Sequence, residues 1–330
     1  MNVLILGGAG FIGMNIAEKL STKSGYQITL ADNLFRGKKD SCLEALIKKE
    51  NVKLIIGDFT QPSAFDQLEK DYDQFYMLAS VVGVKYTEQV PDELIRINTA
   101  LIFNTLEWLK ISSVKKVLFT STSECYAGTI DTWGYDVPTP ESVPLCISDI
   151  KNPRFTYAVT KMLGESGFYH YSKIHGFEVT IVRYHNVYGP RMGFKHVIPQ
   201  VTQRFLDGEQ DFKIYGYDQT RAFNFITDAV HGTVSAMESQ NTNGAIIHIG
   251  DMNAEITIDE LVTYIGELVD YKGRYTYVDA PEGSVFRRCP DTSLAAELFG
   301  YKPQVEWKLG VRHTVEWYRN YLMLGGKVYE

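Results

Sequence analysis

Short apolar segments alternate with amphipathic segments along the first half of the chain. The apolar segments predict buried strands at residues 3–6, 28–31, 52–56, 74–79, 117–120 and 179–182. The amphipathic segments predict helices near residues 11–20, 40–49, 62–69, 92–110 and 157–175. Because strands and helices alternate, we expect an α/β fold in which helices cover both faces of a doubly wound parallel sheet.

The pattern loosens after residue 189, where helices alternate with short strands such as residues 212–215 and 245–249. We therefore expect residues 1–188 to form the main domain. Residues 189–330 should form a smaller C-terminal lobe, with the chain crossing between the two.

The composition is that of an ordinary globular protein, with 45% apolar and 22% charged residues among 330. The net charge of -7 disfavours a nucleic-acid partner. None of the four cysteines lies in a close-spaced pair, so we expect no metal site, no disulfide framework and a reduced, cytoplasmic protein. The chain opens on a strand pattern and has no apolar run of about eighteen residues, so neither a signal peptide nor a membrane span is expected.

A glycine-rich turn joins the first predicted strand to the first predicted helix. The spacing of Gly7, Gly10 and Gly13 allows a tight turn, a close approach of backbone to a pyrophosphate, and close packing of the helix. Asp32 ends the second strand, where its carboxylate would accept hydrogen bonds from ribose hydroxyls and repel a ribose phosphate. The combination predicts a Rossmann-type domain that binds NAD rather than NADP. Two other interpretations stay open: Arg36 could serve a phosphate, and the turn could be merely a glycine turn with a capping aspartate.

Asp58 follows the third predicted strand and has two interpretations of equal weight. Its carboxylate is placed to face the adenine amino group of a bound dinucleotide. It is also placed to cap the helix that begins near Pro62.

Tyr157 and Lys161 are four residues apart, so a helix brings them to one face. A free phenol titrates near pH 10, and a neighbouring ammonium group lowers that pKa by favouring the phenolate. Tyr157 could then remove a proton from a sugar hydroxyl. Thr122 supports this hypothesis, because it ends the fifth strand at the sheet edge where ligands bind. The alternative is a surface pair on an amphipathic helix.

Taken together, the motifs resemble those of the extended short-chain dehydrogenase/reductases, in the nucleotide-sugar epimerase/dehydratase family. They are GGAGFIG at 7–13, DNL at 32–34, GD at 57–58, STSECY at 121–126, YAVTK at 157–161 and RYHNVYGPR at 183–191. The resemblance covers essentially the whole chain. It implies that Tyr157 and Lys161 are catalytic, with Thr122 in the position of a catalytic Ser or Thr and with Ser123 and Glu124 beside it. It implies NAD contacts from Gly7, Gly10, Phe11, Ile12, Gly13, Asp32, Asn33, Asp58, Phe59, Ala79, Asn98, Lys161 and Tyr184.

The same resemblance implies that the C-terminal lobe binds a nucleotide sugar. Asn186 and Arg221 match positions that contact the diphosphate. Arg191, Arg287 and Arg288 are further candidates, because the guanidinium fork binds phosphate in two places.

Members of this family begin by oxidising C4 of the sugar to a ketone. The acidic residue typical of dehydratases is replaced here by Ser123, so dehydration is disfavoured. The sequence favours a nucleotide-sugar 4-epimerase. A UDP-glucuronate-type decarboxylase or a net 4-dehydrogenase would use the same residues, and a non-catalytic NAD-binding sensor or scaffold is the alternative from another class.

Two further segments carry expectations. Residues 128–156, with Trp133 and Arg154, form a longer segment than simple 4-epimerases have, and we expect it to lie over the substrate mouth. The helices at 92–110 and 157–175 have broad apolar faces, which similar proteins pair in a homodimer. The alternative is that both faces only cover the sheet.

Overall fold

The computed structural model of the protein describes residues 1–35, 39–280 and 284–328. The phosphate interpretation of Arg36 therefore lies outside the described residues.

Seven parallel strands form the central sheet, in the spatial order β3-β2-β1-β4-β5-β6-β11. Their bounds are β1 (Asn2–Leu6), β2 (Gln27–Asp32), β3 (Val52–Ile56), β4 (Gln74–Met77), β5 (Lys116–Thr122), β6 (Glu178–Tyr184) and β11 (Ile246–Ile249). The six strands predicted from apolar runs, and the doubly wound α/β fold, are confirmed. The seventh strand comes from the segment that the sequence assigns to the C-terminal lobe, and it pairs with β6 in parallel register.

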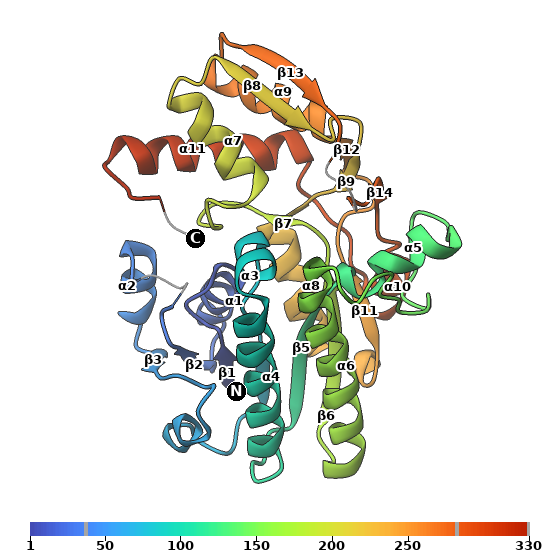
Figure 1. Ribbon diagram of the computed structural model, residues 1–330. Coiled ribbons are helices and arrows are strands. Elements are labelled where there is room, and N and C mark those ends of the chain that lie inside the picture. The colour runs from blue at the N-terminus through green and yellow to red at the C-terminus, as the bar shows by residue number, and fades with distance from the viewer. Residues whose placement is uncertain (36–38, 281–283, 329–330) are drawn as a thin grey trace.

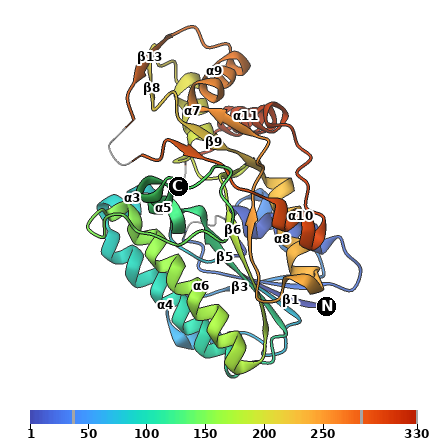
Figure 2. The same cartoon turned by 90° about the vertical axis from the view of Figure 1, so that its right-hand side faces the viewer.

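Alternate residues of each strand face opposite helix layers, as the two-residue period of a strand requires. In β1, Leu4 and Leu6 join one buried cluster, whereas Val3 and Ile5 join the other. Figure 2 shows α4 and α6 on one side of the sheet, and α1, α8 and α10 on the other. These helices are α1 (Phe11–Ser21), α4 (Pro91–Leu109), α6 (Thr156–His175), α8 (Ile226–Glu238) and α10 (Ser293–Phe299). Three elements of residues 189–330, namely α8, β11 and α10, thus return to the sheet.

Shorter helical elements connect the strands at the edges of this domain. They are α2 (Ser41–Ile47), η1 (Pro62–Gln67), α3 (Val84–Gln89), η2 (Ser123–Tyr126), α5 (Ala127–Trp133), η3 (Pro153–Phe155) and η4 (Gln240–Thr242). The helix predicted over residues 62–69 is the short 3-10 helix η1. It ends because Leu68 is extended and is packed in the core.

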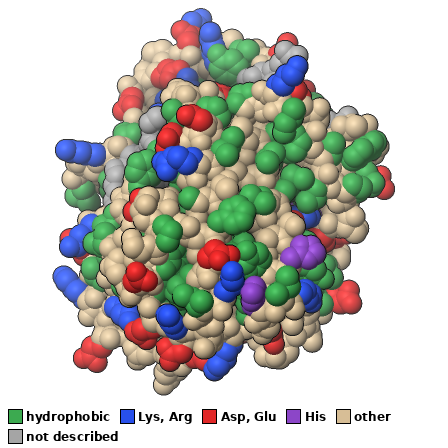
Figure 3. Space-filling model, turned by 60° about the horizontal axis from the view of Figure 1, so that its bottom comes forward, with side chains coloured by type: hydrophobic (Ala, Val, Ile, Leu, Met, Phe, Trp, Pro, Cys, Tyr) green, Lys and Arg blue, Asp and Glu red, His purple; other side chains and the backbone are tan. Residues whose placement is uncertain are grey.

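Three helices, α7 (Val197–Leu206), α9 (Ile258–Val269) and α11 (Trp307–Met323), pack together in the lobe at the top of Figure 1. Short strand pairs accompany them. These are β8 (Asp211–Tyr215) with β13 (Arg274–Val278), β7 (Val187–Tyr188) with β10 (Asn224–Phe225), and β9 (Thr220–Ala222) between β12 (Glu255–Thr257) and β14 (Arg287–Arg288). On the face drawn in Figure 3, acidic and basic side chains are interspersed among apolar ones. Within the described ranges, no helix combines the length and apolar character needed to cross a bilayer.

Candidate active site

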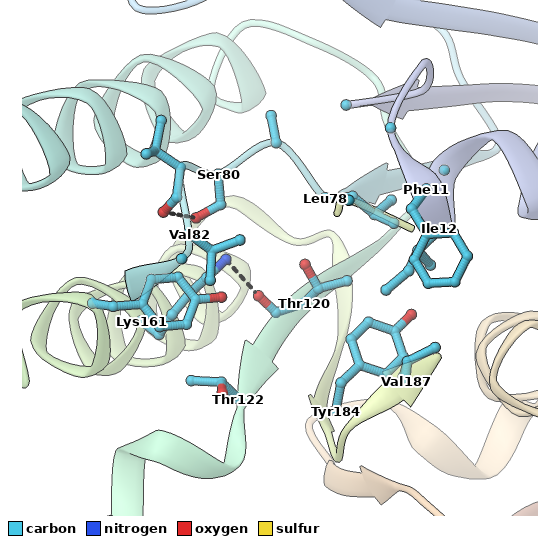
Figure 4. A pocket seen from close by; sticks show the side chains of 18 of the residues that line it. Phe11, Ile12, Leu78, Ser80, Val82, Thr120, Thr122, Lys161, Tyr184 and Val187 are labelled. Carbon is cyan, nitrogen blue, oxygen red and sulfur yellow. Dashed lines mark hydrogen bonds between the residues drawn. The ribbon is translucent and has the colours of Figure 1, made fainter. Parts of the chain in front are cut away.

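A cavity of about 900 Å³ lies along the carboxyl ends of the central strands and extends to the lobe. Gly10 and Asp32 line one end, Tyr157 and Lys161 line the middle, and Arg221 lines the other end. This is where open parallel sheets bind ligands, and the volume is at the upper end of the range for small-molecule sites. In Figure 4, Phe11 and Ile12 lie across the cavity from Lys161, with Tyr184 and Thr122 below.

The glycine-rich turn is packed so tightly that neither Gly7 nor Gly13 can carry a side chain. Gly7 has a φ of 86°, and a Cβ on it would lie 2.7 Å from the backbone nitrogen of Ala79. A Cβ on Gly13 would lie 2.4 Å from the carbonyl oxygen of Gly7. Gly10 differs, because its Cβ would meet only the Gly7 oxygen, at 3.2 Å, and Gly10 lines the cavity. The turn thus leaves a side-chain-free surface at the N-terminus of α1, which suits a pyrophosphate.

Asp32 both holds this turn and lines the cavity. Its carboxylate accepts hydrogen bonds from the backbone N–H of Ala9 at 3.0 Å and of Leu34 at 2.8 Å. Burial raises the pKa of Asp32, although both backbone bonds oppose the shift. Asn33 and Phe59 also line this end. The capping and cofactor interpretations of Asp32 are therefore compatible, and the cradle fits a dinucleotide with free ribose hydroxyls.

Two predicted cofactor residues stabilise loops instead of lining the cavity. Asp58 accepts hydrogen bonds from the backbone and the hydroxyl of Thr60, and Gln61, not Asp58, precedes the 3-10 helix η1. Asn98 is buried and bonds both backbone groups of Val81, accepting from N–H at 2.7 Å and donating to C=O at 3.0 Å. Neither occurs among the described lining residues. Asn98 acts one layer behind the cavity, by positioning the loop that carries Ser80 and Val81.

Tyr157 and Lys161 lie together in the middle of the cavity, on the first turns of α6. Lys161 Nζ is 5.7 Å from the centre of the Tyr157 ring and donates to the carbonyl oxygen of Thr120 at 2.8 Å (Figure 4). Burial lowers the pKa of Lys161 to about 8. Thr122 lines the same wall, and its hydroxyl accepts a hydrogen bond from the backbone N–H of Glu124 at 3.2 Å. The Tyr, Lys and Thr that the sequence predicts to act together therefore line the same cavity.

Glu124 lies at the centre of a positively charged end of the cavity. Arg288 Nη1 donates to Glu124 Oε1, and Arg154 Nη2 lies 3.5 Å from Glu124 Oε2. Burial alone would raise the pKa of Glu124, but Arg288, Arg154 and Arg221 together outweigh it and lower the pKa. Burial and the two neighbouring arginines lower the pKa of Arg221 to about 10, so it stays protonated at neutral pH. Buried Ser123 also lines this part of the cavity.

Arg221 is held by the lobe that carries it. Its Nη1 donates to the carbonyl oxygen of Thr220 at 2.7 Å, and its Nη2 donates to Gln219 Oε1 at 3.1 Å. Asn186, which has a φ of 35°, donates its side-chain amide to the carbonyl oxygen of Ala222 at 2.9 Å. Asn186 therefore lines the cavity and also anchors the strand of Arg221.

Two arginines that the sequence assigns to the substrate lie elsewhere. Arg191 lines the cavity beside the glycine-rich turn, where it donates to Asp40 at 2.5 Å and to the carbonyl oxygen of Ala9 at 3.1 Å. Arg287 forms a two-bond ion pair with Glu255 and is not among the described residues that line the cavity. Neighbouring residues of a strand point to opposite faces, so Arg288 enters the cavity while Arg287 points away.

Arg154 lines the cavity but was not predicted as a site residue. Its position three residues before Tyr157 was the available signal. The rest of the segment 128–156 behaves differently from the expectation. Its end contributes Asn152 and Arg154 to the cavity, whereas Trp133 and Pro144 line a separate surface groove.

Comparisons with known proteins identify the family. The family model for the NAD-dependent epimerase/dehydratase family matches residues 3–250. The UDP-N-acetyl-α-D-glucosaminuronate decarboxylase of Bacillus cytotoxicus is 34% identical over 96% of this chain and 97% of its own. The UDP-glucuronic acid decarboxylase 1 of Xenopus tropicalis is 31% identical over 97% of this chain and 72% of its own. The crystal structure of the Thermotoga maritima UDP-glucose 4-epimerase with UDP-glucose superposes with a TM-score of 0.84 at 28% identity, covering 98% of this chain and all of that one.

These matches confirm the resemblance and the NAD cofactor inferred from the motifs. They also agree with the cradle at the N-terminus of α1, which fits NAD. The chain therefore belongs to the NAD-dependent epimerase/dehydratase family of nucleotide-sugar-modifying enzymes.

Proposed function

We propose that the protein is a decarboxylase of a UDP-linked uronic acid. The observation that carries the proposal is the excess of positive charge at the sugar end, where Arg154, Arg221 and Arg288 surround one carboxylate, Glu124. A diphosphate alone carries about two negative charges, whereas a sugar carboxylate adds a third. The full-length relatives named above that act on UDP-linked uronic acids support the same substrate class.

The middle of the cavity would begin the reaction at C4 of the sugar. When bound, NAD supplies a hydride acceptor and later returns the hydride. Tyr157 accepts the proton of the C4 hydroxyl, and the ammonium group of Lys161 favours the phenolate that this requires. Thr122 is placed to hydrogen-bond the same oxygen.

Oxidation at C4 places a ketone two carbons from the C6 carboxylate. The C5–C6 bond then breaks, carbon dioxide leaves, and the electron pair is delocalised onto the C4 oxygen. Tyr157 and Thr122 would stabilise this enolate, and a proton from solvent would be added at C5. Return of the hydride, together with the proton held by Tyr157, would restore the C4 hydroxyl. Glu124 stays ionised because its pKa is lowered, so its role is to hold the arginines and accept a sugar hydroxyl bond, not to donate the C5 proton.

A 4-epimerase, the reaction that the sequence alone favours, is the second candidate. The superposition on the UDP-glucose 4-epimerase supports it. Epimerisation needs only rotation of the keto sugar, and it requires a third cation near the sugar only if the sugar carries a carboxylate.

The experiment is to incubate the protein and NAD with UDP-glucuronate and UDP-N-acetylglucosaminuronate, with UDP-glucose and UDP-galactose as neutral controls. Mass spectrometry identifies products, and NADH absorbance is followed in parallel. Loss of carbon dioxide from a uronate without accumulation of NADH is expected. An isomer of unchanged mass would indicate the epimerase, and a net loss of two hydrogens with NADH accumulation would indicate a dehydrogenase. No conversion of either uronate would contradict the proposal.

The proposal includes a cytoplasmic homodimer. On α4, Ile95 and Phe103 leave 45% and 46% of their surface exposed, and on α6 Val159 and Leu163 each leave 39% exposed. The two helices pack side by side on the sheet and present these side chains outward, which supports pairing with a second copy. The four cysteines are free thiols, as in a reducing compartment. Light scattering should give twice the chain mass, and Phe103→Asp should reduce it to one chain.

A further inference from the structure

Three buried aromatic rings, those of Tyr126, His185 and His248, lie next to the sugar end of the cavity. Tyr126 is 1% exposed and the two histidines are fully buried, and none of the three is among the described residues that line the cavity. The Tyr126 hydroxyl and Nε2 of His185 share a hydrogen bond of 2.8 Å. The centre of the His248 ring lies 5.5 Å from that of Tyr126 and 4.8 Å from that of His185. We call these residues the three-ring cluster.

Two members of the cluster adjoin, in the chain, side chains that line the sugar end. Tyr126 ends the 3-10 helix η2, whose residues Ser123 and Glu124 line the cavity. His185 directly precedes Asn186, which also lines it. The hydrogen bond between Tyr126 and His185 therefore joins two segments of the cavity wall.

His248 connects the cluster to the segment that carries Arg288. A carbonyl oxygen can only accept a hydrogen bond, so Nδ1 of His248 donates to the carbonyl oxygen of Asp291, at 3.2 Å. Asp291 follows Arg288 by three residues, and the guanidinium of Arg288 donates to Glu124. The three-ring cluster thus contacts each of the segments that bring Glu124, Asn186 and Arg288 to the cavity.

The hydrogen bond within the cluster joins two uncharged groups. Burial raises the pKa of Tyr126 and lowers the pKa of His185, and the positive charge of Arg288 acts on both in addition. Burial also lowers the pKa of His248 to about 3. At neutral pH the phenol therefore keeps its proton, and both imidazole rings are neutral.

The polar atoms of the cluster are only partly paired. Nδ1 of His185 and Nε2 of His248 are buried and have no hydrogen-bond partner in the part of the chain that the structure describes. Burying an unpaired polar atom costs free energy, and apolar rings of similar shape would avoid that cost. The stability of the core alone therefore does not account for two imidazole rings at this place.

We infer that the three-ring cluster positions the sugar end, and that the bond between Tyr126 and His185 holds η2 so that Glu124 stays within reach of Arg288. The inference rests on the proposed function, in which the charged groups of this end bind the sugar. Tyr126 and His185 are positioning residues, because they act through the cavity residues next to them. Without the bond, η2 would shift, and the folded protein would bind the sugar more weakly while its NAD end stays intact.

The test measures binding of UDP-glucuronate, UDP-N-acetylglucosaminuronate and UDP-glucose by calorimetry. The NAD-loaded protein is used in a Tyr157→Phe background, which prevents turnover. Tyr126→Phe removes only the hydroxyl, whereas His185→Gln keeps a hydrogen-bonding group near the position of Nε2. The double variant Tyr126→Phe with His185→Phe removes the bond and the unpaired nitrogen of His185 together. Thermal melting and NAD affinity are recorded for each variant.

Tyr76→Phe is the matched control. It also removes one buried hydroxyl, which donates to Gln74 Oε1 at 3.3 Å, and neither residue is among the described lining of the cavity. It should bind each ligand as the Tyr157→Phe protein does.

Tyr126→Phe is expected to weaken uronate binding about 3- to 10-fold and to change NAD affinity less than about 2-fold. The double variant should melt at least as high as Tyr126→Phe, because it no longer buries the nitrogens of His185, yet it should bind the uronate just as weakly. His185→Gln should bind more tightly than the double variant, because it can still bond the Tyr126 hydroxyl.

Unchanged affinity in Tyr126→Phe and in the double variant, with lower melting, would mean that the cluster only stabilises the fold and would overturn the inference. An equal loss of affinity in Tyr76→Phe would also overturn it. If the Tyr157→Phe protein binds UDP-glucose but neither uronate, the proposed function fails, and the same comparison made with UDP-glucose decides the positioning role. If it binds none of the three ligands, both fail.

Discussion

The two ends of the cavity are lined by different parts of the chain. The NAD end is made mainly of backbone, in one turn of residues 7–13 with Asp32 beside it. The sugar end is made of four charged side chains that come from segments far apart in the chain: Glu124, Arg154, Arg221 and Arg288. In the proposed function, the first end selects by shape and the second by charge. Substitutions at the NAD end should therefore affect stability and cofactor affinity, whereas substitutions at the sugar end should change ligand preference.

Removing the phenol hydroxyl of Tyr157, which lies between the two ends, should have the largest effect on turnover. Tyr157→Phe is expected to lower kcat about 100- to 10,000-fold, because the general base is lost. NAD and nucleotide-sugar binding should each change less than about 2-fold, since both ends stay intact. Turnover by mass spectrometry and binding by calorimetry check this. Undiminished turnover would remove Tyr157 from the mechanism, whereas a protein without any turnover on nucleotide sugars would fit the sensor or scaffold alternative.

A buried ion pair lies behind the site and joins α6 to β6. Arg183 on β6 forms two hydrogen bonds to Glu165 on α6, at 2.8 Å and 2.7 Å, and Ser121 on β5 donates to the same carboxylate at 2.5 Å. Glu165→Gln would leave a buried guanidinium without a countercharge, so we expect the free energy of unfolding to fall by about 3 to 5 kcal/mol.

The double variant Glu165→Met with Arg183→Met is the matched control, because it removes both charges together. It should recover most of the lost stability in chemical denaturation. Equal losses in the single and double variants would show that the ion pair does not act as a unit.

The charge of Lys161 makes stability depend on pH. Its pKa is about 8 in the folded protein, below the ordinary value of 10.5. Between these values the unfolded chain binds more protons, so the free energy of unfolding should rise with pH by up to about 3 kcal/mol. Lys161→Met should be more stable at neutral pH and should lack this rise. Denaturant titrations from pH 7 to pH 10 compare the two, and parallel curves would argue against a buried ammonium.

Two glycine variants at the NAD end test the contrast between the two ends of the cavity. They have the smallest expected effects on stability and on NAD affinity. Gly13→Ala should destabilise the fold by about 1 to 3 kcal/mol, because its methyl group meets the Gly7 oxygen. Gly10→Ala should melt closer to the unmodified protein yet bind NAD at least about 10-fold more weakly, a loss of about 1.4 kcal/mol. Normal NAD affinity in Gly10→Ala would mean that the cofactor does not approach this turn.

The same contrast explains what the sequence could predict. The glycine-rich turn, Asp32, and the Tyr157–Lys161 pair are local patterns, and each implies its own geometry. The approach of Arg288 to Glu124 depends on how the lobe strands dock, which no local pattern encodes. The choice between Arg287 and Arg288 required the register of β14 against β9.

Strand β11 shows the same limit at the level of the fold. The apolar run at residues 245–249 predicts a strand but does not indicate which sheet it joins, because the chain passes through the lobe first. The helix expected at residues 62–69 is shorter than predicted, because Leu68 is extended and packs in the core.

The central claim is that the charged end of the cavity binds a sugar carboxylate that is lost after oxidation at C4. The most direct measurement is proton NMR of the reaction with UDP-glucuronate, or with UDP-N-acetylglucosaminuronate, in heavy water. The account predicts a UDP-pentose, or its 2-acetamido counterpart, that carries deuterium at C5, where carbon dioxide left and solvent supplied the proton. A product that keeps its carboxylate, carries no deuterium and is inverted at C4 would contradict the account and establish a 4-epimerase.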